Sequence, residues 1–146
     1  MTDQLDDSAA LTDLDPASLP VADGDEPWTR AEVAEVVDEL LGQRRHLTER
    51  LAVQEAELAG LLADGGDGAG ADAADLGAAN LERDQELHLV SSERETLAQI
   101  ERSLRRLVGG DFGVCASCAR PIPKMRVMAF PRATLCVSCK QREERR

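Results

Sequence analysis

Two heptad-patterned segments on either side of one glycine-rich stretch constrain this chain more than any other feature. Apolar residues recur at alternating spacings of four and three, which is the pattern of helices that pack along a narrow seam. Seven of nine seam positions are apolar in the first run and seven of ten in the second, with Leu87 expected to support the weaker middle of the second. The expected seam positions are Val33, Val37, Leu40, Arg44, Leu47, Leu51, Gln54, Leu58 and Leu61, followed by Leu76, Ala79, Arg83, Glu86, Val90, Glu93, Leu97, Ile100, Leu104 and Leu107.

The stretch between the runs is GDGAGADAADLG, from Gly66 to Gly77, and it holds almost nothing large. Because two runs of about 34 residues, each roughly 50 Å long as a helix, flank one flexible break, a hairpin whose seams bury each other is favoured. The alternative is that each helix pairs with another chain. We expect a monomeric, mainly α protein: a long antiparallel helical hairpin (coiled coil) over 28–110 with its tip near 64–77, followed by a small module that ends in a helix.

The start of the first helix is marked by local signals. Thr29 and Glu32 have the spacing of a capping box, in which the hydroxyl and the carboxylate each accept a backbone N–H of the first turn. Trp28 and Val33 flank them as a hydrophobic staple. Residues 1–27 carry eight acids, no Lys or Arg, three prolines and no hydrophobic period, so we predict a mostly disordered acidic tail.

Four cysteines follow the hairpin in the order C-x2-C-x17-C-x2-C. This spacing is typical of a zinc site, because each C-x2-C turn directs two thiolates to one ion and two turns complete a tetrahedron. Four thiolates leave no open coordination position, so one structural Zn2+ is predicted in a zinc-finger module over 111–146, held by Cys115, Cys118, Cys136 and Cys139. The alternative is four free or redox-active thiols. The predicted core of this module is small: Phe112, Val114, Ile122, Val127, Phe130 and Leu135.

Composition limits the classes of function. The net charge of −11 argues against general nucleic-acid binding, although residues 112–146 carry eight Lys or Arg against two Glu and are either a contact for an acidic surface or a solvated face. His46 and His88 are isolated and expected on the surface; no catalytic triad, phosphate-binding loop or dinucleotide fingerprint is found, so we do not expect an enzyme. The absence of a signal peptide and of an 18-residue apolar run predicts a soluble cytoplasmic protein without membrane contact.

The segments GDFGVCASCARPIP and AFPRATLCVSCK resemble the C-terminal zinc finger of the DksA/TraR family of bacterial transcription regulators. The matching residues between the two cysteine pairs are Ile122, Arg126, Ala129, Pro131 and Ala133. The hairpin agrees in placement and length, so the resemblance covers roughly residues 28–146. It implies a protein that binds RNA polymerase without sequence-specific DNA binding, inserts its coiled-coil tip into the secondary channel and modulates initiation.

The same resemblance implies that the tip of the hairpin contacts the active centre of the polymerase. Family members carry D-x-x-D-x-A at the tip, and Asp72, Asp75 and Gly77 occupy these positions, with Gly in place of the usual Ala. From the residues alone, Asp72 as N-cap and Asp75 at the third helical position would serve equally well to cap the second helix. The two roles are compatible.

Family members that answer to the alarmone guanosine tetraphosphate place basic residues on the second helix, where this chain has Ser92, Thr96 and Gln99. Lys140 matches a family contact with the alarmone. The resemblance therefore implies polymerase regulation with weak or no alarmone synergy. The alternative function is a zinc-stabilised coiled-coil adaptor for another protein partner. A transcript-cleavage factor with an acidic tip ranks last, because such factors do not usually carry this zinc module.

Overall fold

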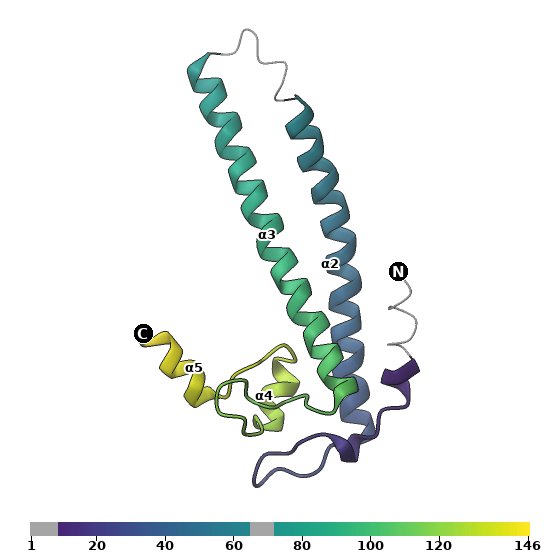
Figure 1. Ribbon diagram of the computed structural model, residues 1–146. Helices are drawn as coiled ribbons and strands as arrows, with labels where there is room; N and C mark the ends of the chain where they lie inside the picture. Colours follow the sequence, from purple (N-terminus) through teal and green to yellow (C-terminus); the bar gives the residue numbers. More distant parts are fainter. Residues whose placement is uncertain (1–8, 65–71) are drawn as a thin grey trace. The chain divides into compact units, whose positions relative to one another are not determined.

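The computed structural model describes residues 9–64 and 72–146 (Figure 1). After a helical turn at 9–12, its elements are η1 (Pro16–Ser18), α2 (Arg30–Asp64), α3 (Ala73–Gly109), α4 (Lys124–Ala129) and α5 (Val137–Glu144). The one β feature of the described residues is an isolated bridge between Val114 and Pro121. The mainly α class, the long helix pair and the C-terminal helix predicted from the sequence are thereby confirmed. Across the part of the chain that the structure describes, no helix is long and apolar enough to cross a membrane.

The chain divides into two compact units. The first contains the described residues up to Gln43 together with Gln99–Arg146, and the second contains Arg44–Ala98. Helices α2 and α3 are each divided between the two units. Within each unit, the segment of α2 and the segment of α3 lie side by side (Figure 1). The α4 helix, α5 and the four cysteines belong to the first unit.

In the first unit, the facing sides of α2 and α3 bury large apolar side chains, as the heptad pattern predicts. Leu40, Ile100, Leu104 and Leu107 expose 1% of their surface or less. Val33 and Val37, from the first turns of α2, are also buried. This end of the hairpin therefore has a conventional apolar core.

In the second unit, the seam is thinner and more polar. Its buried apolar residues are Leu47, Leu51, Leu58 and Val90. Two ion pairs join the helices: Arg50 with Glu93, and Arg94 with Glu55, where Arg94 Nη2 lies 2.5 Å from Glu55 Oε1. These contacts connect α2 to α3 within the chain, as a hairpin requires.

Some expected seam positions in the second unit are exposed. Leu61 exposes 36% of its surface and Leu76 48%, and Ala79 is exposed as well. A straight helix drifts by about 20° per heptad from a 3.5-residue repeat, so a strict heptad pattern leaves the seam toward its ends. The expectation that Leu87 supports the seam is wrong: it is 43% exposed and lies about 100° around the helix from the seam position Glu86.

Local signals set the ends of the long helices. The Thr29 N–H donates to Glu32 Oε2 at 2.9 Å and the Glu32 N–H donates to Thr29 Oγ1 at 3.2 Å, which confirms the capping box before α2. At the other end, α3 stops at Gly109, and Gly110 adopts φ +81°, the left-handed conformation that terminates many helices.

Residues 9–27 differ from the disorder predicted for the acidic tail; residues 1–8 of that tail lie outside the described residues. Leu11 and Leu19 are buried in the first unit. The η1 turn is capped by Asp15, whose Oδ1 accepts the Ala17 N–H at 3.0 Å. Trp28 Nε1 donates to the Pro20 carbonyl at 3.1 Å. A few apolar anchors and tertiary hydrogen bonds thus order a segment whose composition alone indicates disorder.

Candidate metal centre and hairpin tip

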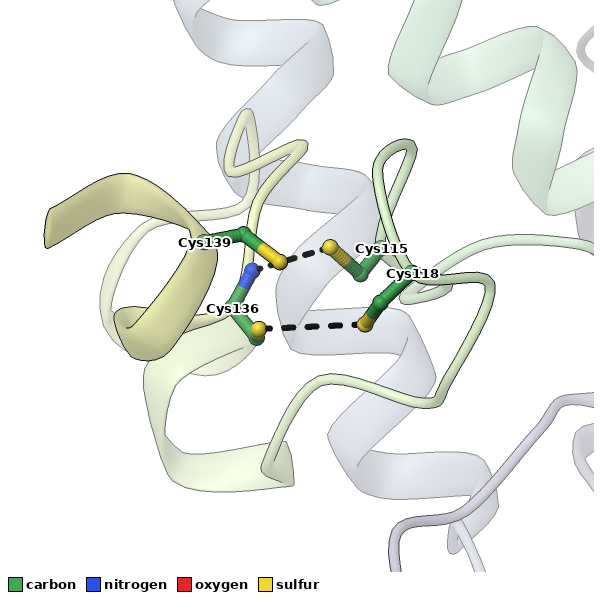
Figure 2. Close-up of side chains that lie close together, drawn as sticks. All are labelled: Cys115, Cys118, Cys136 and Cys139. Atoms are coloured by element: carbon green, nitrogen blue, oxygen red, sulfur yellow. Dashed lines mark hydrogen bonds between the residues drawn. The ribbon is translucent and has the colours of Figure 1, made fainter. Parts of the chain in front are cut away.

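The four cysteines converge from two segments of the chain. Cys115 and Cys118 lie in the loop after α3, Cys136 is the N-cap of α5, and Cys139 lies in the first turn of α5 (Figure 2). Their four sulfur atoms all lie within 4.8 Å of one another, and the Cys118 and Cys136 sulfurs are 3.9 Å apart. The spacing pattern predicted this convergence.

The first cysteine pair sits on a tight turn. The Cys115 N–H donates to the Arg120 carbonyl, and the Ala119 N–H donates back to the Cys115 carbonyl, both at 2.9 Å. Ala119 adopts φ +60° and Gly113 adopts φ +82°, so the backbone bends into the left-handed region on both sides of the pair. This turn directs both thiols to the same side.

The sulfur cluster fits one tetrahedral zinc ion. Four sulfurs at the usual zinc–sulfur distance of about 2.3 Å lie about 3.8 Å from one another, close to the 3.9 Å between Cys118 and Cys136. Cys115 and Cys139 are buried, and the other two are half-buried. Because four sulfurs complete the coordination shell, the site is suited to a structural ion and not to metal catalysis.

Hydrogen bonds to the sulfurs favour the thiolate form at two positions. Burial raises the pKa of the Cys115 thiol, but the backbone N–H groups of Cys136, Cys118 and Ser117 outweigh it and lower the pKa to about 6. The pKa of Cys139 is lowered by the Ser117 side chain and by Arg142, whose Nη2 lies 3.0 Å from the sulfur. Zinc binds thiolates, so these donors help to prepare the site for the metal.

The apolar core beneath the cysteines is smaller than predicted. Phe112, Ile122 and Val127 are buried, and Val114 and Leu135 are half-buried. Phe130 was expected in this core and is 64% exposed. It forms the C-cap of α4, and the buried position next to it is taken by Pro131. A metal therefore has a large share in holding this module together.

The two predicted tip aspartates lie at the start of α3 and are exposed. Asp72 precedes the helix and its Oδ1 accepts the Asp75 N–H at 2.8 Å, which is the geometry of an N-cap. A Cβ added to Gly77 would meet open space, so packing does not explain the glycine at this position. The predicted hairpin turn itself, residues 65–71, lies outside the described residues.

Lys140 lies exposed on α5, where its Nζ is 3.8 Å from Glu144. It lines a shallow depression together with Arg126 and Arg132. Arg132 Nη1 donates to Gln99 Oε1 at 3.2 Å. Arg132 of the cysteine module thus places a positive charge beside Gln99 of α3, which is uncharged. The sequence analysis missed Arg132 because only tertiary structure brings it to α3. His46 and His88 are exposed, as expected.

Comparison with known proteins agrees with this geometry. The family model of the prokaryotic dksA/traR C4-type zinc finger matches residues 110–145. The RNA polymerase-binding transcription factor DksA of Caulobacter vibrioides is 36% identical over 76 residues, which cover 52% of this chain and 54% of that protein. DksA of Escherichia coli K12 is 38% identical over 69 residues, which cover 47% of this chain and 46% of that protein. The matches thus span about half the length of these relatives.

A solved structure extends the similarity beyond the cysteine module. Transcription factor DksA2 from Pseudomonas aeruginosa superposes with a TM-score of 0.64 at 34% identity, covering 80% of this chain and 85% of that one. A match over 80% of the chain is much longer than residues 110–145, which the family model covers. We conclude that the chain belongs to the DksA/TraR family and that its four-cysteine cluster holds one structural zinc ion.

Proposed function

We propose that this protein is an RNA polymerase-binding transcription regulator that inserts its hairpin tip into the secondary channel and modulates initiation. The relatives in Caulobacter vibrioides and Escherichia coli are RNA polymerase-binding transcription factors by name. The observation that carries the proposal to this chain is the exposed Asp72 and Asp75 pair at the start of α3. They stand at the end of helices about 50 Å long, in the D-x-x-D spacing of the family tip.

The two aspartates would have different roles at the tip. The Asp72 carboxylate accepts the Asp75 N–H and so holds the first turn of α3 in place. The Asp75 side chain follows on the exposed surface of that turn. Carboxylates delivered into the channel would act by charge, on basic groups of the polymerase or on its metal-bound centre. In this proposal the chain regulates the polymerase and performs no catalysis of its own.

The remaining features of the chain are consistent with a protein partner in the bacterial cytoplasm. Residues 28–111 carry 18 acids against nine Arg, which disfavours binding to DNA phosphates and therefore sequence-specific DNA recognition by the hairpin. We propose that the protein acts as a monomer, in which ion pairs join the two helices of one hairpin.

We further propose Lys140 as an alarmone contact of reduced strength. Ser92, Thr96 and Gln99 supply no positive charge on α3. Beside Gln99, a phosphate group would be held by the cysteine module alone, through Lys140 and Arg132. Guanosine tetraphosphate should then add little to the effect of the protein on promoter output. Strong synergy that Lys140→Ala alone abolishes would show that the helix positions matter less than proposed.

Co-purification with bacterial RNA polymerase is the first test. The tagged full-length protein should retain core polymerase subunits; retention of a different partner without polymerase would favour the adaptor alternative. The tip is then tested by the double variant Asp72→Asn and Asp75→Asn, which keeps side-chain size and much of the capping ability. Asp84→Asn, an exposed change on the body of α3, is the matched control.

The double variant should bind polymerase as the parent does and lose its effect on transcription, whereas the control keeps both. If the double variant regulates as well as the parent at equal occupancy, the aspartates are helix caps only. Loss of polymerase binding together with helicity would instead assign them a structural role. The single variant Asp75→Asn leaves the Asp72 cap intact and separates these outcomes.

A further inference from the structure

Lys124 joins two parts of the first unit that are far apart in the sequence, the cysteine module and residues 25–32. Its side chain is 13% exposed. Its Nζ donates to the Glu32 carboxylate at 3.0 Å, to the Glu26 carbonyl at 3.1 Å and to the Pro27 carbonyl at 3.5 Å. One ammonium group from the cysteine module thus binds the chain entering α2 and the capping residue of that helix.

The backbone of Lys124 makes a second connection. Lys124 is the first residue of α4, and Pro123, in the N-cap position, supplies no side-chain cap. Instead Asp25 Oδ2 accepts the Lys124 N–H at 2.8 Å, across 99 positions of sequence. A carboxylate at this place suits a helix N-terminus, where backbone N–H groups lack partners. The N-terminal segment therefore caps a helix of the cysteine module.

Trp28 completes the contact on its apolar side. It is buried, its ring centroid lies 6.2 Å from that of Phe112, and Lys124 Nζ lies 5.7 Å from its ring centroid. Its indole N–H is bonded to the Pro20 carbonyl, which anchors the preceding segment. We call residues 20–28 the strap, and the contacts of Asp25 and Lys124 the latch.

The latch is connected to the cysteines through α4, which lies in the loop between the two cysteine pairs. Val127 of α4 is fully buried, and a Cβ added to Gly113, two residues before the first cysteine, would lie 3.8 Å from its Cγ2. Arg126 Nε donates at 3.3 Å to the carbonyl of Leu135, one residue before the third cysteine. The position of α4 is therefore set by contacts beside both cysteine pairs, which one zinc ion would hold together.

We infer that Asp25 and Lys124 are positioning residues of the metal centre: they form a latch that closes the strap on the zinc module only while the metal holds that module folded. The metal and the closed strap then stabilise each other, since a coupling free energy between two sites acts equally in both directions. The inference depends on the zinc centre and not on polymerase binding, so it stands or falls separately from the proposed function.

The strap side is tested with the one tryptophan of the chain, Trp28. Removing zinc from the full-length protein with a chelator should shift Trp28 emission to the red and speed amide hydrogen exchange in residues 19–32. Exchange in the second unit should change little. Zinc added back under reducing conditions should reverse both changes.

The metal side is tested by two matched pairs of variants. Asp25→Ala removes the cap from the strap and is compared with Asp23→Ala, an exposed acid on the same segment. Lys124→Gln removes the ammonium group and is compared with Arg145→Gln, an exposed cation of the same module. Competition with a chromogenic chelator measures zinc affinity. We expect Asp25→Ala and Lys124→Gln to weaken it roughly tenfold, inside the range typical of coupled sites, and the two controls to match the parent.

Two results would overturn the inference. One is a zinc affinity of Asp25→Ala equal to that of Asp23→Ala, because the latch would then add nothing to metal binding. Asp25 lies outside the cysteine module, so its substitution tests the latch without changing the module itself. The other is unchanged exchange in residues 19–32 after zinc removal, while the module between the cysteines exchanges freely. If Lys124→Gln fails to fold, the Asp25 pair alone decides.

Discussion

In the first compact unit, Leu40, Ile100, Leu104 and Leu107 expose 1% of their surface or less, whereas in the second Leu81, Leu87 and Leu89 expose between 43% and 59%. The same two helices run through both units. In the first unit, which we call the base, apolar burial, the cysteine cluster and the strap act together. In the second unit, which we call the arm, a few buried apolar residues and cross-helix ion pairs join the helices.

The difference corresponds to two demands on the protein. An arm that enters a channel, as proposed, has to be narrow, and a two-helix cross-section cannot surround its own seam with apolar side chains. Its polar seam also discourages other pairings, because a polar residue among apolar ones fixes the register of a coiled coil at some cost in stability. The base has no such restriction and carries the core.

Removal of the zinc should have the largest effect, and it should be confined to the base. Cys118→Ser takes one thiolate from the cluster, and zinc-finger peptides gain about 10–16 kcal/mol of apparent binding free energy from a structural zinc. Residues 112–140 should unfold while most of the helicity of α2 and α3 survives. Circular dichroism and metal analysis measure both, with one zinc per chain expected in the parent. Parent protein purified under reducing conditions without zinc would contradict the prediction.

A matched pair of leucine truncations compares the two parts directly. Leu104→Ala should lower the free energy of unfolding by about 2–5 kcal/mol, because the side chain is 1% exposed and its removal leaves a cavity. Leu87→Ala, on the same helix at 43% exposure, should stay within about 0.5 kcal/mol of the parent. Urea denaturation followed by circular dichroism gives both values, and equal losses would erase the distinction between base and arm.

The two ion pairs of the arm should differ in how much they contribute to stability. Glu93 is buried, its Oε1 is bonded to Arg50, and its Oε2 has no partner among the described residues. Arg50→Met should cost about 1–3 kcal/mol because it leaves a buried acceptor unsatisfied, and adding Glu93→Leu should recover most of that loss. Arg94→Met, in the exposed pair with Glu55, should cost less than about 1 kcal/mol. Thermal unfolding of the parent and the three variants checks the order; an equal cost for the two arginine changes would contradict it.

The smallest effect is a pH dependence at the base. The Thr29 backbone N–H, then Lys124, lowers the pKa of Glu32 below its usual value. A lowered folded-state pKa contributes stability that is present above the ordinary value of about 4.3 and is lost as pH falls through the folded value. Glu32→Gln keeps the capping-box geometry but not the charge. Its melting temperature should lie below that of the parent at pH 7 and approach it below pH 4; a constant difference across this range would assign the effect to packing.

Local chemistry made much of this protein predictable. The cysteine spacing predicted the cluster, because two short turns determine where four thiols point. The Thr29–Glu32 capping box and the Asp72 cap were found as predicted, because each joins groups within one helical turn. The heptad pattern predicted which sides of the helices meet, and failed where a polar seam and the drift of a straight helix leave leucines exposed.

The amino-acid sequence by itself determined two long helices, their caps and the glycine stop after α3, since each depends on residues at most a few turns apart. It also determined the metal ligands, since each C-x2-C pair is local and the two pairs have the spacing of a zinc site. Tertiary structure alone decided that residues 9–27 are ordered, that α4 borrows its cap from Asp25, that Arg132 reaches Gln99 and that Phe130 faces outward. Composition classes the tail as disordered because it is acidic and poor in apolar residues. Its order comes from partners outside the tail: Trp28 and the first turns of α2 for its earlier part, and Lys124, about 100 positions away, for Asp25. These partners are in place only once the helices and the cysteine module have folded.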